Sequence, residues 1–228
     1  MKSLTRTILA ICFSLLLGGA TAAQMGMRMG PPMPHGLFNP VVGSGALYQM
    51  VKADGTKTTM EIVVLGKESV GGKDGYWFEM TMYGTPRGDM IIKNLTVLDG
   101  ANIQVARAVM QMPGRPPMEM SGPMLQMHSQ PQPADIRAQA EDLGTESITT
   151  PAGTFSCHHY RTKDHPGEAW LSDKVTPYGL VKQQGNGSVL VLLKVISDAK
   201  DKITGTPVPF NPMGMGMGQP PESAEPQQ

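Results

Sequence analysis

Short runs of alternating apolar and polar residues, separated by glycine-containing turns, recur along the middle of this chain. Met60, Ile62 and Val64 share one side of one run, and the Asp54-Gly55 pair before it is typical of a hairpin turn. Similar runs cover residues 46–52, 76–83, 89–98 and 102–112. No helical pattern of ten to fifteen residues separates these runs, so we expect the front half to form an antiparallel meander.

The back half continues the pattern after an interruption. Residues 113–133 are rich in Pro, Met and Gln, and we expect a long loop there. Residues 134–144 carry the one helical pattern, with Ile136, Ala140 and Leu143 in step and a final glycine where a C-cap is expected. Further strands are expected at residues 146–149, 154–162, 168–173, 179–183 and 188–197. The last run is apolar on both faces, which predicts a central strand.

About ten strands and one short helix result from this count. A sheet of that size twists and exposes edges, so we expect it to curl. We therefore predict a mainly β fold, an antiparallel curved sheet forming a half-barrel or barrel, with one short helix and disordered termini. Apolar side chains on the hollow side either fill the interior or line a cavity for an apolar ligand, and the sequence leaves both open.

The first residues have the features of an export signal. Lys2 and Arg6 precede an apolar stretch, Ile8 to Leu17, and small residues follow at Ala20 to Ala23. We predict a signal peptide at residues 1–23 and a periplasmic or secreted protein. The stretch is shorter than the ~20 residues of a spanning helix, and no later segment approaches that length, so we expect no membrane span. Cys12 lies inside the stretch rather than at the cleavage point, which disfavours a lipid anchor.

Two methionine-rich segments flank the expected fold. Residues 24–40 and 211–228 combine Met, Pro and Gly without an apolar period, so we expect both to be disordered. The predicted organisation is a signal peptide (1–23), a Met/Pro/Gly-rich segment (24–40), an antiparallel β half-barrel domain (41–210) and a Met/Gly/Pro-rich tail (211–228).

Charge and cysteine content exclude several classes of protein. The 19 basic and 19 acidic residues balance, so no basic surface is expected to bind nucleic acid. After cleavage Cys157 is the only thiol, and no intrachain disulfide can form. A buried, small apolar role for Cys157 is favoured over an exposed thiol.

Three segments carry a resemblance to known proteins. They are TTPAGTFSCHHYR (Thr149 to Arg161), WLSDKVTPYGLVK (Trp170 to Lys182) and ITGTPVPFNPM (Ile203 to Met213). Together they resemble a group of uncharacterised secreted bacterial proteins and, more distantly, the lipoprotein-carrier (LolA/LolB-like) superfamily. The resemblance implies an antiparallel half-barrel over a hydrophobic cavity, and a binding or carrier role for an acyl or other apolar group. It gives no residue a chemical task.

Methionines at every second position suggest a different function. Residues i and i+2 of an extended chain project to one side about 6–7 Å apart, and flexible thioethers select soft Cu(I) or Ag(I). The candidate metal ligands are those of the two terminal segments, namely Met25, Met27, Met29, Met33, His35, Met213, Met215 and Met217. The same spacing recurs at Met80/Met82, Met110/Met112 and Met118/Met120. For Met80 and Met82, beside Phe78, core packing is the favoured interpretation.

Two smaller groups of residues could contact a ligand. Cys157 and His159 share one face of a strand, with His158 on the other, but zinc needs three or four ligands, and the next candidates, Asp164, His165 and Glu168, lie beyond a turn. A structural role is therefore favoured for this group. Trp77 and Trp170 are packing anchors by default, and candidate contacts for an apolar ligand if either lies at the mouth of a cavity.

No catalytic motif is present. The chain has neither a G-x-S-x-G elbow nor a phosphate-binding glycine motif. Glu61, Glu79 and Asp89 are isolated acids on expected strands, where a solvated face is favoured. We predict a non-enzymatic secreted protein whose curved sheet accepts an apolar or acyl ligand. The alternatives are a periplasmic Cu(I)/Ag(I)-binding protein that uses its Met-rich tails, and a structural or interaction protein with an envelope protein partner. Beyond Cu(I), no cofactor is expected.

Overall fold

The computed structural model describes residues 37–163 and 167–210. The predicted signal peptide, most of the 24–40 segment and the 211–228 tail lie outside these residues. Contacts divide the chain into residues 1–33 and 34–228, and the fold described here belongs to the second unit. Within the described ranges, no helix has the length and apolar character needed to cross a membrane.

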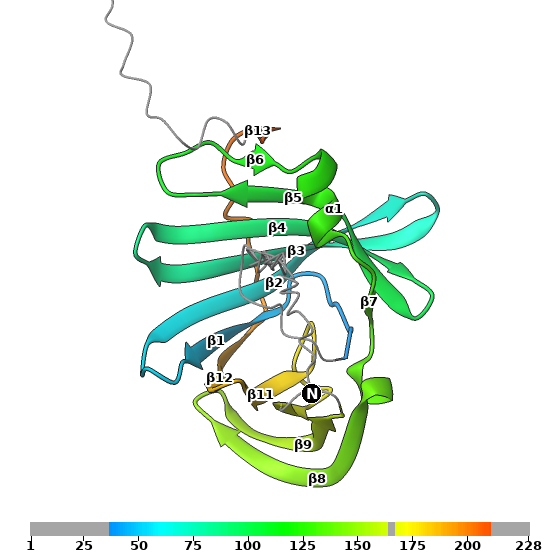
Figure 1. The fold of residues 1–228 in the computed structure, drawn as a ribbon, viewed down its shortest axis with the longest axis vertical. Coiled ribbons are helices and arrows are strands. Elements are labelled where there is room, and N and C mark those ends of the chain that lie inside the picture. Colours follow the sequence, from blue (N-terminus) through cyan, green and yellow to red (C-terminus); the bar gives the residue numbers. More distant parts are fainter. Residues whose placement is uncertain (1–36, 164–166, 211–228) are drawn as a thin grey trace, which may run out of the picture. The chain divides into compact units, whose positions relative to one another are not determined.

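The described residues form mainly strands, with one short α-helix and one 3-10 helix (Figure 1). The first five strands are β1 (Gly45–Val51), β2 (Lys57–Val70), β3 (Lys73–Thr85), β4 (Gly88–Asp99) and β5 (Asn102–Gln111). The next elements are β6 (Met118–Glu119), α1 (Gly122–His128), β7 (Gln132–Pro133), η1 (Ile136–Gln139) and β8 (Ala140–Thr150). The chain continues with β9 (Gly153–Thr162), β10 (Gly167–Leu171), β11 (Leu180–Gly185), β12 (Ser188–Ile196) and β13 (Val208–Pro209).

One open, curved sheet contains all of these strands, which confirms the predicted fold class (Figure 1). Its order is β13-β6-β5-β4-β3-β2-β1-β12-β11-β10-β9-β8, and β7 pairs with the start of β5. Strands β1 to β5 follow one another as the predicted meander, and β12 lies centrally between β1 and β11, as its two apolar faces indicated. In the described part of the chain the end strands β13 and β8 do not pair, so the sheet stays open instead of closing into a barrel.

The two faces of the sheet differ in what covers them. We call the face that carries Met60, Phe78 and Met110 the inner face; Phe38 packs on Phe78, and α1 packs beside Met110. The opposite, outer face carries Glu79. This division follows from the pleat, because successive side chains of a strand point to opposite faces.

A C-terminal strap, residues 198–207, crosses the outer face and runs behind the sheet in the view of Figure 1. The backbone N–H of Ala199 donates to Gly43 next to β1, and that of Lys202 donates to Glu79 on β3. Thr204 then reaches Gln111 on β5, and β13 pairs in parallel with β6. The strap therefore links the middle of the sheet to its β6 end.

The predicted helix at residues 134–144 is wrong. The chain forms only the 3-10 turn η1, started by the side chain of Asp135 accepting from the N–H of Arg137, and then extends as β8. Pairing with β9 from Ala140 onward supplies the backbone hydrogen bonds that a helix would have made. Gly144, with φ +98°, lies in a bulge of β8 and is not a helix C-cap.

The expected loop at residues 113–133 is also partly wrong, because it contains β6, α1 and β7. Pro123 lies in the first turn of α1, where a missing N–H costs nothing, and Ser121 is the N-cap residue. Met124 and Leu125 of α1 then pack against methionines of β5 and β6. This tertiary contact stabilises a seven-residue helix that would not be stable in isolation.

Candidate functional site

Methionines follow the inner face from strand to strand. Met60 is opposite Met82, and Met82 is opposite Met90, across β2, β3 and β4. Met110 of β5 is opposite Met118 of β6. Directly opposite residues of an antiparallel ladder project to one face with Cβ atoms about 4.5–5.5 Å apart. The register therefore gathers thioether side chains that are far apart in the sequence.

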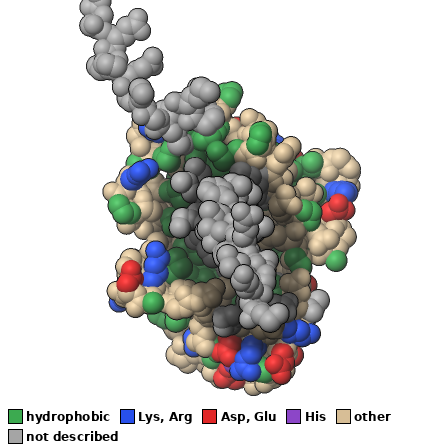
Figure 2. Space-filling view, viewed as in Figure 1, with side chains coloured by type: hydrophobic (Ala, Val, Ile, Leu, Met, Phe, Trp, Pro, Cys, Tyr) green, Lys and Arg blue, Asp and Glu red, His purple; other side chains and the backbone are tan. Residues whose placement is uncertain are grey.

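Met90, Met110 and Met118 belong to a compact group at the β6 end of the sheet, which we call the methionine cluster. Its buried members are Ala108, Met110, Met118 and Met120. Partly exposed residues pack against them: Met90, Ile92, Val105, Met112, Met124, Leu125 and Phe210. In Figure 2, hydrophobic side chains are visible along the front of the molecule, the side on which α1 lies. The cluster is thus a buried apolar core with an accessible rim.

The middle of the inner face is filled by side chains. Phe38 packs on Tyr76, Phe78 and Tyr178 with ring centroids 5.7–6.3 Å apart, and Phe78 stacks on Tyr178 at 5.8 Å. Tyr48 is fully buried and donates to the carbonyl oxygen of Leu180 at 3.1 Å, and burial raises the pKa of its hydroxyl. Met80 is buried in this core, as predicted from its position beside Phe78.

Both tryptophans lie on the outer face. The indole N–H of Trp77 donates to Glu68 at 2.8 Å, and Lys93 lies over the ring, 5.3 Å from its centroid. Trp170 is opposite Lys182, whose ammonium is 4.2 Å from the indole centroid. The ladder continues from Lys182 through Val191 to Gln49, on the side opposite the inner residue Tyr48. Cations thus cover both rings, and an apolar ligand contact by either tryptophan stays a prediction.

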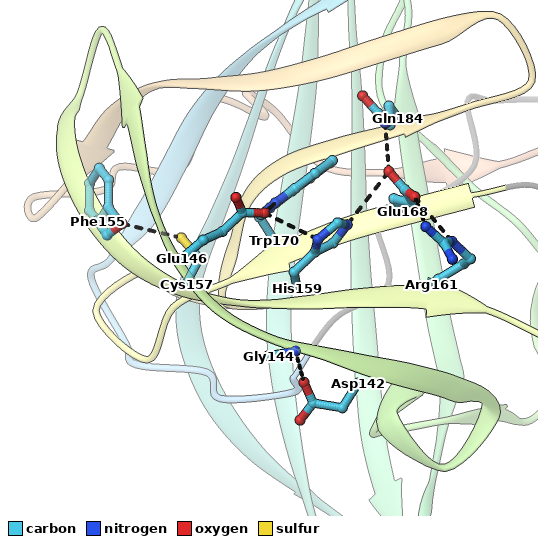
Figure 3. A network of polar contacts seen from close by, with 10 residues as sticks. All are labelled: Asp142, Gly144, Glu146, Phe155, Cys157, His159, Arg161, Glu168, Trp170 and Gln184. Carbon is cyan, nitrogen blue, oxygen red and sulfur yellow. Dashed lines mark hydrogen bonds and ion pairs between the residues drawn. The ribbon is translucent and has the colours of Figure 1, made fainter.

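Figure 3 shows a polar network around His159, on the outer side of β8 to β11. The imidazole Nδ1 lies 3.1 Å from Glu146, and the ring stacks on Trp170 with centroids 4.3 Å apart. Trp170 also donates its indole N–H to Glu146. The second imidazole nitrogen, Nε2, is buried without a hydrogen-bond partner and faces Glu168 at 3.5 Å. One histidine therefore lies between two carboxylates from neighbouring strands.

Glu168 is the branching point of this network. It accepts from Arg161 at 2.9 Å and from Gln184 at 2.7 Å (Figure 3). The Arg161 guanidinium holds the pKa of Glu168 below its usual value. These bonds join β9, β10 and β11 and leave neither carboxylate oxygen of Glu168 without a contact. The network therefore has a structural role, because its side chains link neighbouring strands.

Cys157 and His159 share a face, as predicted, and the favoured structural role agrees with their surroundings. Cys157 is fully buried, and burial, with the nearby charge of Glu146, raises the pKa of its thiol to about 11. A protonated thiol is a poor metal ligand and nucleophile. Among the described residues, no group of three or more His, Cys, Asp or Glu side chains is arranged to hold a metal. Asp164 and His165 lie outside the described residues.

Two hollows lie beside β8 to β12. One, of about 820 Å³, is lined by Arg161, Thr162, Lys163, Gly167, Glu168 and residues 184–189. The other, of about 650 Å³, is lined by Leu37, Arg137, Asp142, Ser156, His158, Tyr160 and residues 171–174. In the second, His158 lies 3.9 Å from Asp142, beyond hydrogen-bond distance, so no acid–base pair is set up there. Few large apolar side chains line either hollow, so neither resembles the aliphatic cavity that an acyl ligand needs.

The expectation that Glu61 and Glu79 belong to a solvated face is wrong. Glu79 is fully buried beneath the strap, and burial raises the pKa of its carboxyl to about 7. Glu61 is mostly buried and pairs with the ammonium of Lys202, which also contacts Tyr83 at 2.9 Å. Alternation along β2 and β3 predicts an outward direction for both acids, but not the strap that covers them. Asp89 is exposed, as expected.

The predicted metal ligands of the terminal segments lie outside the described residues. These are Met25, Met27, Met29, Met33, His35, Met213, Met215 and Met217. Binding of Cu(I) or Ag(I) by these segments therefore stays a prediction. The Met-x-Met pairs Met110/Met112 and Met118/Met120 are described, and both belong to the methionine cluster.

Comparison with known proteins gives distant matches to solved structures. No protein-family model and no curated protein matches the chain. A predicted lipoprotein of Parabacteroides distasonis is 17% identical, with a TM-score of 0.36, over 72% of this chain and 100% of the other. A predicted exported protein with a YmcC-like fold from Bacteroides fragilis is 15% identical, with a TM-score of 0.35, over 71% and 99%. MucB is 12% identical, with a TM-score of 0.36, over 74% and 59%. At these TM-scores the likenesses assign neither a family nor an activity.

Proposed function

We propose that the protein is an exported, non-enzymatic binding protein that holds an apolar or acyl group at the methionine cluster. The observation that carries this proposal is the rim of the cluster, where Met90, Met112 and Met124 are partly exposed beside buried Met110 and Met118. A ligand that covers the rim removes apolar surface from water, which is worth about 25 cal/mol per Å².

The chemistry of methionine suits such a surface. Its unbranched side chain and polarizable thioether adapt to ligands of irregular shape, so methionine-rich surfaces accept a range of apolar partners. The rest of the inner face supports the rim, because Phe38, Phe78 and Tyr178 form a packed aromatic core. Export is supported by the signal-peptide pattern at residues 1–23.

Displacement of a fluorescent fatty acid from the full chain tests this function. We expect saturable binding, and an affinity at least tenfold lower in M112K/M124K, because two ammonium groups would lie on the apolar rim. The control is V42K, which places one of these ammonium groups at an apolar side chain that is 51% exposed outside the cluster. Circular dichroism and thermal unfolding check that each variant is folded.

Absence of saturable binding, or equal losses in M112K/M124K and V42K, would overturn this function. Such a result would favour one of the two alternatives, a periplasmic Cu(I)/Ag(I)-binding protein that uses its Met-rich tails or a structural or interaction protein of the envelope. Binding that is lost only when residues 211–228 are removed would also contradict the assignment to the cluster.

A further inference from the structure

The methionine cluster contains more methionine than packing requires. Six of its eleven residues are methionine, whereas the whole chain has 19 in 228 residues. A core that needs only apolar volume is filled more favourably by Leu or Ile, because burial of Met removes more rotamer freedom. The enrichment therefore points to a property of the thioether itself.

The register brings these thioethers together. Met110 and Met118 are directly opposite each other. The β4–β5 register pairs Ile92 with Met110 and Ile91 with Gln111, so Met90 and Met112 are the next neighbours along the same two chain segments. Met124 reaches the same cluster from α1. Neighbouring side chains of this kind start about 4.5–5.5 Å apart, and the three rotatable bonds of methionine let the sulfur atoms converge on one point.

The chemistry of the cluster selects one class of ion. All eleven residues are apolar, with no carboxylate, imidazole or thiolate among them, so hard cations such as Mg²⁺ and Ca²⁺ find no suitable ligand there. Neutral, soft thioethers favour Cu(I) and Ag(I). A monovalent ion also has a lower desolvation cost than a divalent ion.

We propose that the rim of the methionine cluster binds one Cu(I) or Ag(I) ion through the sulfur atoms of Met90, Met112 and Met124. These three side chains are partly exposed and come from β4, the residue that follows β5, and α1, so an ion can reach them from solvent without opening the core. This site is in the folded part of the chain and is distinct from the predicted terminal ligands. It does not depend on the proposed binding of an apolar group, although both ligands would occupy the same rim.

Titration with Ag(I), a redox-stable soft ion, tests the site in the full chain. The background variant carries Leu at all terminal methionines of the predicted tail site, which are Met25, Met27, Met29, Met33, Met213, Met215 and Met217. We expect this background to bind one Ag(I) by native mass spectrometry. Adding M90L/M112L/M124L should weaken that binding at least tenfold, because leucine keeps the apolar volume and removes the sulfur.

The matched control adds M50L/M60L/M80L, three methionines outside the cluster, and should leave Ag(I) binding unchanged. In the background variant, ¹³C-methyl spectra should show Ag(I)-dependent shifts for Met90, Met112 and Met124. A background that binds no Ag(I), or equal affinities in the two triple variants, would overturn the site. Fatty-acid binding should survive M90L/M112L/M124L, so the failure of one proposal can be told from the failure of the other.

Discussion

The backbone N–H of Lys202 donates to both carboxylate oxygens of Glu79, a residue 123 positions earlier in the chain, at 3.1 and 3.3 Å. The carboxyl is fully buried between the outer face of β3 and the strap. The Lys202 ammonium meanwhile contacts Glu61 and Tyr83 on the same face. A single residue of the strap thus joins two strands through its backbone and its side chain.

Stability should fall as the pH rises through the titration of Glu79. Burial raises the pKa of this carboxyl from 4.5 to about 7, so the folded chain holds the proton more tightly than the unfolded chain. The free energy of unfolding should be highest below about pH 4.5 and decrease by roughly 1–3 kcal/mol up to about pH 7. Urea unfolding of wild type and E79Q between pH 4.5 and 7.5 measures this.

The difference in the free energy of unfolding between wild type and E79Q separates the titration of Glu79 from that of other groups in the same pH range. E79Q keeps a carbonyl acceptor for the N–H of Lys202, and its side chain has no proton to lose between pH 4.5 and 7.5. The free energy of unfolding of E79Q should therefore change less with pH than that of wild type. The neighbouring Asp201 shifts in the opposite direction, because hydrogen bonds from Lys93 and Glu79 outweigh its partial burial and lower its pKa. Parallel pH profiles for wild type and E79Q would contradict this assignment.

Removal of the Lys202 side chain should loosen the strap. K202A leaves the mostly buried Glu61 without its cation, and we expect a loss of about 2–3 kcal/mol in the free energy of unfolding. The control is K200A, since Lys200 pairs with Asp198 on the surface and both side chains are more than three-quarters exposed. Its loss should be under about 0.5 kcal/mol. Similar losses in the two variants would show that the ammonium of Lys202 does not hold the strap.

Two neighbouring histidines should differ in their contribution to stability. H159A removes the ring that stacks on Trp170 and contacts Glu146, and we expect it to cost about 2–3 kcal/mol. H158A changes a side chain that is 60% exposed and should cost about 0.5 kcal/mol or less. Guanidinium unfolding followed by far-UV circular dichroism measures both. A larger loss in H158A than in H159A would contradict the structural role of the His159 network.

The thiol of Cys157 should react only when the protein unfolds. Its burial and its raised pKa of about 11 leave little thiolate at pH 8. In a Cys12→Ser chain, we expect Ellman's reagent to modify the native protein at least roughly 100-fold more slowly than the chain in 8 M urea. Rapid modification without urea would show that the strands around Cys157 open readily.

Local pattern was sufficient to predict much of the sheet. The period-two spacing of Met60, Ile62 and Val64 survives in β2, and the two apolar faces of residues 188–197 correctly placed β12 in the centre. Both features depend on neighbours in sequence and on the general rule that apolar faces are buried. The helical spacing of Ile136, Ala140 and Leu143 failed because pairing with β9 outweighed a weak local preference.

The candidate site depended on contacts that no local pattern contains. Glu79 is buried because residues 198–207 cross it, and nothing near Glu79 in sequence predicts that crossing. The Met-x-Met pairs at the ends of β5 and β6 can be found in the sequence, but their packing with Met90 and Met124 needs the β4–β5–β6 register and α1. Since α1 falls in a segment expected to be a loop, the cluster was not predicted.

The bulge at Gly144 also affects whether two copies of the chain can pair along the edges of their sheets. Within residues 37–163 and 167–210, β8 is the last strand of the sheet, and no further strand pairs with the outer side of its eleven residues. The bulge interrupts its regular spacing, and Glu141, Asp142 and Glu146 add negative charge along it. A second copy would have to match an irregular backbone while bringing like charges together, which disfavours edge-to-edge aggregation at high concentration.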